Sequence, residues 1–196
     1  MQTQAPVRLG MPLDEFLAQS SAQPFELIDG ERIDKMPTAA EHAMVIRMLL
    51  MLLYGHVIAR QLGEVFAEAT FILPNREDPN WVKGSRTPDL MFYSAERFAT
   101  YISAEADWRA RPFALVPDLV IEVISPTDTY SAVSAKVDVY LRDGVRLIWI
   151  VDPQRRKAAV HTPGQPMQQL DEGNTLSGGE IIPGFTLLLA DLFKQV

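Results

Sequence analysis

The chain has 196 residues, of which 47% are hydrophobic and 22% charged, with a formal net charge of −7. This length fits one compact domain with a sizeable core, and the acidic balance excludes a protein that coats nucleic acid by bulk electrostatics. The absence of cysteine excludes a disulfide framework and a thiolate metal site, and it fits a reducing cytoplasm.

The N-terminus lacks the apolar core of a secretory signal. The longest apolar run, residues 43–53, is interrupted by Arg47 and is too short to span a bilayer. We therefore expect a cytoplasmic protein that forms one domain over residues 1–196, with residues 1–10 flexible.

The first half of the chain carries clear signals for a hairpin and a long helix. Asp29-Gly30 is a turn dipeptide between two short runs, which is the strongest local hairpin signal in the sequence. Thr38 is suited to cap a helix, Glu41 stands three residues later as in a capping box, and Gly63 follows the last apolar residues. The expected elements are a helix over residues 11–20, the hairpin over 25–37, a core helix over 38–62 and two short strands over 64–67 and 70–73.

The second half predicts an interior strand followed by a helix. The run LVIEVI over residues 119–124 is too apolar and too rich in β-branched residues for a surface strand. Gly144 ends the helix that follows it. The expected elements are a polar loop over residues 74–87, a strand over 89–94, a mixed helix and loop over 94–117, the interior strand, a helix over 130–142, a strand over 146–153 and a β-rich tail over 157–193.

Two carboxylates fall on these predicted strands. Asp89 opens one strand, and Glu122 lies in the middle of the interior strand. A buried carboxylate is costly unless a positive charge pairs with it, and a divalent cation can pair with two carboxylates at once. Asp118 shares a strand face with Glu122, but the strand between them spans about 13 Å, which is too far to share one ion. If the strands of Asp89 and Glu122 are neighbours, the two side chains can approach to about 5 Å and hold one Mg²⁺.

Further candidates for the same site are an amine and a third acid. Lys136 lies on the helix after the Glu122 strand, on the flank of its apolar stripe, from where it can point back at the sheet. An amine beside a metal-bound water can orient the nucleophile and stabilise charge on a phosphate. Glu41, near the start of the long helix, can reach the metal through a water. Lys83 and Arg86 are candidate contacts to nucleic acid, although such residues are more often solvated loop surface.

Each of these residues also has a purely structural interpretation. Asp89 stands where a strand begins, a common position for a turn residue. Glu122 and Lys136 can form an ion pair that serves stability alone, and Lys136 by itself is typical of a surface lysine whose stem lies on apolar neighbours. A capping box fully explains Glu41. The three histidines have no ligand spacing, so no zinc site is expected.

Several segments together resemble one bacterial family. Their order and spacing are similar to those of the Uma-two family, a group of restriction-endonuclease-like proteins in the PD-(D/E)XK nuclease superfamily. The resemblance covers nearly the whole chain, from residue 11 to residue 193. The segments are FELIDGERIDKMPTAAEH at 25–42, TPDLMFYS at 87–94, PDLVIEVISP at 117–126, Lys136 with Tyr140 and Gly144, LIWIVDP at 147–153 and PGFTLLLADLF at 183–193.

This resemblance implies an α/β fold of the restriction-endonuclease-like class, a mixed β-sheet flanked by α-helices with a β-rich C-terminal part. It also implies one active-site metal ion and phosphodiester hydrolysis. Asp89 matches the first acid of the motif and Glu122 the second, while Glu41 and His42 match an acidic-His pair on the first core helix.

The lysine departs from the superfamily pattern. It normally stands two residues after the second acid, where this chain has Ile124, and in this family it is displaced to the next helix, here at Lys136. Relatives often carry an acid four residues before that lysine, where this chain has Ala132. A helical pairing that would orient Lys136 is therefore missing.

The leading hypothesis is a Mg²⁺-dependent DNA endonuclease, with Mn²⁺ as a possible substitute. A homodimer is expected because a duplex has two strands to cut, and no membrane partner is expected. The competing hypothesis is a nuclease-fold protein with a weakened site that acts as a nucleic-acid-binding or scaffold module, which Ala132 and the acidic net charge support. The sequence leaves open which nucleic acid is cut and with what sequence specificity.

Overall fold

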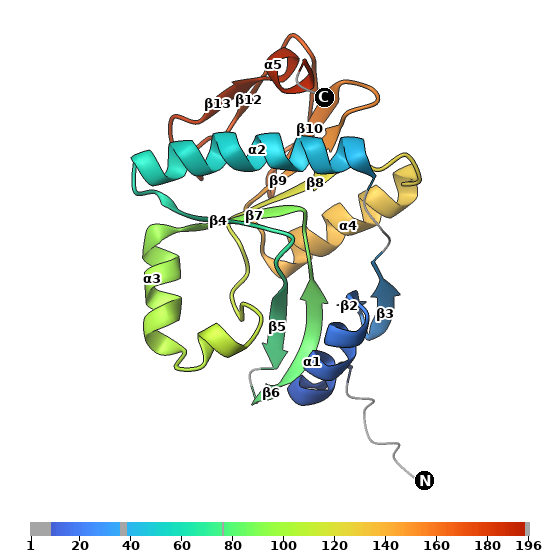
Figure 1. Ribbon diagram of the computed structural model, residues 1–196, viewed down its shortest axis with the longest axis vertical. Helices are drawn as coiled ribbons and strands as arrows, with labels where there is room; N and C mark the ends of the chain where they lie inside the picture. The colour runs from blue at the N-terminus through green and yellow to red at the C-terminus, as the bar shows by residue number, and fades with distance from the viewer. Residues whose placement is uncertain (1–8, 36–38, 76, 195–196) are drawn as a thin grey trace.

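The computed structural model of the protein describes residues 9–35, 39–75 and 77–194. This part of the chain folds into two main sheets with helices packed against them (Figure 1). The strands of the larger sheet, in spatial order, are β11 (Gln168–Asp171), β10 (Lys157–His161), β9 (Leu147–Asp152), β8 (Leu119–Val123), β7 (Leu90–Ser94) and β4 (Gly63–Ala67). The neighbours β8 and β9 run parallel and the other described pairs run antiparallel, so the predicted mixed sheet is confirmed.

Long helices cover both faces of this larger sheet (Figure 1). Alternate residues of β8 point to opposite sides, because a strand has a side-chain period of two. Ile121 and Val123 pack with α2 (Ala40–Ala59), whereas Val120 packs with α4 (Tyr130–Asp143). Glu122 is two residues after Val120, so its side chain points to the same face of the sheet, toward α4.

The helix α2 packs one apolar face into the core. Val45, Leu49, Leu53 and Val57 recur at helical spacing and are fully buried. By length and composition α2 could also cross a membrane, but a core helix of a soluble protein passes the same test. Thr38, the expected N-cap, lies outside the described residues, and the N-cap position is occupied by Ala39 without a side-chain hydrogen bond.

The smaller sheet is built around the predicted hairpin, which is confirmed. Asp29 and Gly30 adopt positive φ values of 52° and 86°, the geometry that an Asp-Gly turn favours. Phe16 from α1 (Leu13–Ala22) packs on Phe25 and Leu27 of the hairpin. The strands, in spatial order, are β1 (Met11–Pro12), β6 (Asp78–Arg86), β2 (Phe25–Ile28) and β3 (Glu31–Asp34), with β5 (Phe71–Asn75) also paired to β6.

Several predicted boundaries were wrong. The segment over residues 74–87, which was expected to be a polar loop, contains β6, the longest strand described. This strand lacks an apolar alternation, and it is stabilised by hydrogen bonds to three other strands. The first helix begins at Leu13, with Pro12 as its N-cap. Leu9 accepts a hydrogen bond from the indole of Trp81. Residues 1–8, which make up most of the segment expected to be flexible, lie outside the described part.

The remaining elements complete the two ends of the larger sheet. The mixed segment after β7 forms α3 (Ala95–Ala104) and a short 3₁₀ turn at Trp108–Ala110. The β-rich tail contains a hairpin of β12 (Thr175–Ser177) and β13 (Thr186–Leu188), followed by the short helix α5 (Leu189–Phe193) instead of a longer strand. The larger and the smaller sheet are joined by residues 87–89, which connect β6 to β7. Asp89 thus lies at the junction of the two sheets.

Candidate active site

The carboxylate of Glu122 projects from β8 toward α4. Only 7% of this residue is exposed. Its Oε2 atom accepts a hydrogen bond from Nζ of Lys136 at 2.9 Å, and its Oε1 atom accepts a short bond of 2.5 Å from the hydroxyl of Tyr140. Both oxygens of this buried acid therefore have donors in the protein.

Lys136 and Tyr140 stand one turn apart on α4, so both side chains lie on the face toward the sheet. The helix is capped at one end by Thr129, whose side chain accepts a hydrogen bond from the backbone N–H of Ala132, and it ends at Gly144 with φ of 100°. The side chain of Lys136 is 41% exposed. The lysine side chain is therefore partly open to solvent, while its ammonium group is held by Glu122 in the absence of an acid at Ala132.

Asp89 lies immediately before β7, next to the part of β8 that contains Glu122. The strands β7 and β8 are antiparallel neighbours with Leu90 opposite Ile121, so Asp89, the residue before Leu90, lies close to the Glu122–Val123 end of β8. The expectation that the two strands are adjacent is confirmed. Asp89 is 7% exposed, and its Oδ2 atom accepts a hydrogen bond of 2.7 Å from the backbone N–H of Val123.

His42 holds the same oxygen of Asp89. Its Nε2 atom lies 3.1 Å from Oδ2 of Asp89. Burial works to lower the pKa of His42, but the hydrogen bond and the charge of Asp89 outweigh burial and raise this pKa above its usual value. Glu41 is exposed and makes no ion pair with any residue that the structure describes. Of the Glu41-His42 pair, the histidine is therefore the member in contact with Asp89.

A third acid, Glu26, was missed by the sequence analysis. It lies on β2 with 5% exposed, and its Oε1 atom accepts a hydrogen bond of 2.6 Å from the backbone N–H of Thr87. The signal was present, because Glu26 is a single charge between Phe25 and Leu27, which point to the opposite face of β2. The same pattern, an acid inside an apolar strand, had identified Glu122.

The three acids act on one another electrostatically. Burial raises the pKa of Glu122, the ammonium of Lys136 opposes this, and the charges of Asp89 and Glu26 raise the pKa further. For Lys136, burial works to lower the pKa, but Glu122 and Glu26 outweigh it and raise the pKa above its usual value. Lys136 is therefore a cation at neutral pH, and the acids gather a local excess of negative charge that a bound cation would relieve.

The chemistry of these side chains fits a hard cation such as Mg²⁺, which prefers oxygen ligands. Within residues 9–35, 39–75 and 77–194, no group of three or more His, Asp or Glu side chains forms a site that could hold a metal ion. Mg²⁺ commonly binds to one or two carboxylates and retains several waters, so two nearby acids can be enough for a site. Glu122 would have to share its oxygens with Lys136 and Tyr140.

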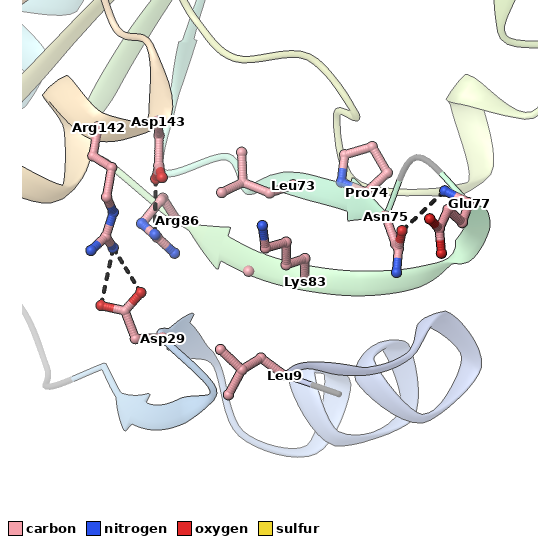
Figure 2. Close-up of a pocket in the computed structure, with 11 residues that line it drawn as sticks. Leu9, Asp29, Leu73, Pro74, Asn75, Glu77, Lys83, Arg86, Arg142 and Asp143 are labelled. Atoms are coloured by element: carbon pink, nitrogen blue, oxygen red, sulfur yellow. Dashed lines mark hydrogen bonds and ion pairs between the residues drawn. The ribbon is translucent and has the colours of Figure 1, made fainter. Parts of the chain in front are cut away.

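The two basic candidates line a pocket between the hairpin of the smaller sheet and α4, which has a volume of about 840 Å³ (Figure 2). Arg86 is almost fully buried, and it donates to the carbonyls of Leu27 and Ser85 and forms an ion pair of 2.8 Å with Asp143. The side chain of Lys83 extends into the pocket (Figure 2). The guanidinium group of Arg86 is thus occupied by contacts within the protein, and Lys83 is the one of the two that can contact a ligand.

Comparisons with known proteins agree with this architecture. A family model named Uma2, described as "Putative restriction endonuclease", matches residues 13–190. A crystal structure described as a "putative nuclease belonging to DUF820" from Anabaena variabilis ATCC 29413 is 22% identical, with a TM-score of 0.76 over 94% of this chain and 98% of the other. At that identity the likeness shows the fold alone.

A more distant likeness is to the structure of a DrdV–DNA complex, which is 13% identical over 76% of this chain and 93% of the other. Its TM-score of 0.31 is too low to carry an argument. A search of curated proteins finds no match.

Proposed function

Since the chain belongs to the Uma2 family, whose model spans residues 13–190, we propose that it is a metal-dependent endonuclease that hydrolyses phosphodiester bonds of DNA. The observation that carries the proposal is that Asp89, just before β7, accepts a hydrogen bond from Val123, the residue next to Glu122 on β8, while the ammonium of Lys136 is hydrogen-bonded to Glu122. Two carboxylates can hold a metal ion that activates a water, and an ammonium group can stabilise the charge that develops on the phosphate.

The roles of the residues follow from their contacts. Asp89 and Glu122 would hold Mg²⁺, or Mn²⁺ in its place, and the metal would activate a water and polarise the phosphoryl oxygen. The backbone N–H of Val123 and the ring of His42 keep the Asp89 carboxylate in place. Tyr140 orients Glu122 through its hydroxyl.

Lys136 acts as a fixed positive charge in this proposal. Because the neighbouring acids raise its pKa, it is protonated at neutral pH and does not serve as a base. Its ammonium group instead stabilises the negative charge that develops on the phosphate during hydrolysis. Glu26 adds to the negative potential that attracts the metal. Glu41, at the exposed start of α2, could contact the metal only through a water.

The substrate and setting of the enzyme are part of the same proposal. Because the protein has a net charge of −7, its overall electrostatic field repels DNA. DNA therefore has to be held by local contacts and by the metal. Lys83 is our candidate for a phosphate contact outside the site. We place the enzyme in the cytoplasm, away from membranes, and we propose that it acts as a homodimer because a duplex has two strands to cut.

Relaxation of supercoiled plasmid in the presence of Mg²⁺ or Mn²⁺ tests the proposal. The parent protein should nick the plasmid only when metal is present, and Glu122→Gln, which is nearly the same size, should not. Lys157→Gln is the control, because this lysine forms an exposed ion pair with Asp171 on another part of the sheet. Cleavage that survives in Glu122→Gln would refute the catalytic assignment.

A second candidate function is a nuclease-fold protein that binds nucleic acid without cutting it. It is favoured by the donors on both oxygens of Glu122 and by Ala132 in place of an acid, because both features weaken a metal site. Under this alternative the parent shifts labelled DNA in a gel, and neither metal nor Glu122→Gln changes the result.

A further inference from the structure

The helix α2 carries an apolar stripe on the side that faces away from the sheet. Its members are separated by four, three, four and three residues, which is the heptad spacing of helices that pair with other helices. We call this set the outer stripe, and it consists of Met44, Met48, Met51, Gly55 and Ile58.

The outer stripe is open to solvent except at Met48, which is partly buried against the core. Met51, at its middle, is 58% exposed, Met44 and Ile58 near its two ends are also exposed, and a Cβ added at Gly55 would meet no atom within 4 Å. Only 33% of the most apolar part of α2 is buried. Soluble proteins seldom leave a contiguous apolar surface of this kind uncovered, and where they do it usually marks an interaction site.

We propose that the outer stripe binds the outer stripe of a second copy of this chain, with the two α2 helices antiparallel and the two-fold axis close to Met51. An isologous interface requires a surface that complements itself, and the outer stripe meets this requirement because Met51 stands at its centre. In this arrangement Met44 of one protomer faces Ile58 of the other.

The charges at the ends of α2 complement one another in this arrangement. Glu41 lies in the first turn of the helix and Arg60 directly after its last turn, and both are exposed. Neither side chain forms an ion pair with the residues that the structure describes. Antiparallel pairing brings Glu41 near Arg60 of the partner subunit at both ends, and it also aligns the two helix dipoles favourably.

Gly55 lets the two helices approach closely. A glycine in the interior of a helix costs about 1 kcal/mol relative to alanine, so an exposed one is unfavourable unless it serves packing. With no side chain at this position, the backbone of α2 can come near Met48 or Arg47 of the partner subunit. Small residues at a helix interface have this effect.

A lipid surface fits the outer stripe less well than a second copy does. A helix that lies in a membrane interface carries several Lys or Arg residues along its polar face. Between Ala40 and Ala59 the only such residue is Arg47, and the chain as a whole is acidic. Anionic lipids would therefore repel the protein rather than attract it.

The arrangement has a consequence for the site, and this step rests on the proposed function. His42, which contacts Asp89, is nine residues from Met51 along α2, or about 14 Å at 1.5 Å per residue. The antiparallel pair therefore places the two sites at opposite ends of the interface, about 27 Å apart along the helices. Each protomer would then cut one strand of a duplex.

The mass in solution tests the proposal without any measurement of activity. By light scattering after gel filtration, the parent should have twice the 21.9 kDa mass of the chain, and Met51→Lys should have the mass of one chain. Met167→Lys is the matched control, because Met167 is similarly exposed on a different surface and the variant should remain dimeric. A monomeric parent, or a dimeric Met51→Lys variant, would overturn the proposal.

Single cysteines test the geometry, because the chain has none of its own. Under a mild oxidant, Met51→Cys should cross-link to itself, whereas Met44→Cys and Ile58→Cys should cross-link only when the two variants are mixed. Efficient self-cross-linking of Met44→Cys would indicate a parallel pair and contradict the proposal. Flotation of the parent with anionic vesicles, lost in Met51→Lys, would assign the outer stripe to lipid instead. Failure of nuclease activity would leave all these outcomes unchanged.

Discussion

The Oε2 atom of Glu122 lies 2.9 Å from Nζ of Lys136, and this contact joins the central strand β8 to the helix α4. The lysine is displaced from the position two residues after the second acid, yet its ammonium group reaches the same carboxylate from the helix. Because Ala132 supplies no acid on α4 itself, Glu122 is the partner that orients Lys136. In the proposed function, this contact takes the place of the lysine position that the motif lacks.

Replacement of Lys136 by methionine separates a catalytic role from a structural one. Methionine keeps much of the apolar stem, so the loss is mainly that of the charge. We expect plasmid cleavage to fall by about 10²–10³-fold, the usual cost of losing one group that stabilises transition-state charge. Calorimetric affinity for Mn²⁺ should not weaken, because a competing positive charge has been removed. Equal losses of cleavage and of affinity would instead show that Lys136 serves structure alone.

Replacement of Glu26 by glutamine tests the third acid. The amide oxygen of glutamine can still accept the hydrogen bond from Thr87, so the fold should persist. Removal of one of three converging charges should weaken Mn²⁺ binding at least about tenfold and, without metal, raise the thermal midpoint. Glu31→Gln on the exposed neighbouring strand is the control. A lower midpoint together with unchanged affinity would exclude Glu26 from the metal environment.

The ion pair between Arg86 and Asp143 should contribute to stability rather than to activity (Figure 2). Arg86→Met leaves Asp143 buried without a partner, which should cost about 3–5 kcal/mol of unfolding free energy in urea. The double variant Arg86→Met/Asp143→Leu should recover much of this loss. Arg142→Met, which breaks an exposed pair with Asp29, should cost at most about 1 kcal/mol. Normal stability in Arg86→Met would contradict the assignment.

Asp118 should make the protein sensitive to acid. Burial works to raise the pKa of this carboxyl, but a hydrogen bond from the Ser94 backbone and the charges of Arg97 and Arg146 outweigh burial and lower the pKa. A lowered pKa in the folded state contributes stability that is complete above about pH 4 and is lost as the pH falls further. Asp118→Asn should therefore reduce the unfolding free energy at pH 7 and flatten its decline below pH 4. If the unfolding free energy of Asp118→Asn declined below pH 4 as steeply as that of the parent, this account would be contradicted.

The positions of several candidate site residues could be predicted because buried charges stand out in apolar segments. Glu122 interrupts a β-branched strand, and Lys136 follows at a helical spacing that points back to it, so local patterns were sufficient for both. Glu26 carries the same signal in a shorter and more polar hairpin, where it was overlooked. The contact of His42 with Asp89 depends on how α2 crosses the sheet, which no local pattern contains.

The errors in the fold have a similar physical origin. The strand β6 contains Asn80, Lys83 and Gly84 and shows no apolar alternation, so its sequence does not predict a strand. It forms because it is hydrogen-bonded to β1, β2 and β5. The tail LLLADLF was expected to form a strand, but its last five residues form α5, whose Leu189 and Leu192 lie in the same core cluster as the buried residues of α2. In both segments tertiary contacts outweigh local propensity.

The position of a bound metal tests the central claim most directly. In a crystal grown with Mn²⁺, an anomalous difference map should contain a peak with one oxygen of Asp89 and one of Glu122 as ligands. Such a peak would establish that these two acids, 33 residues apart in the sequence, share one ion. A map with no peak between them, or with Mn²⁺ bound elsewhere while Lys136 and Tyr140 keep both oxygens of Glu122, would contradict the account.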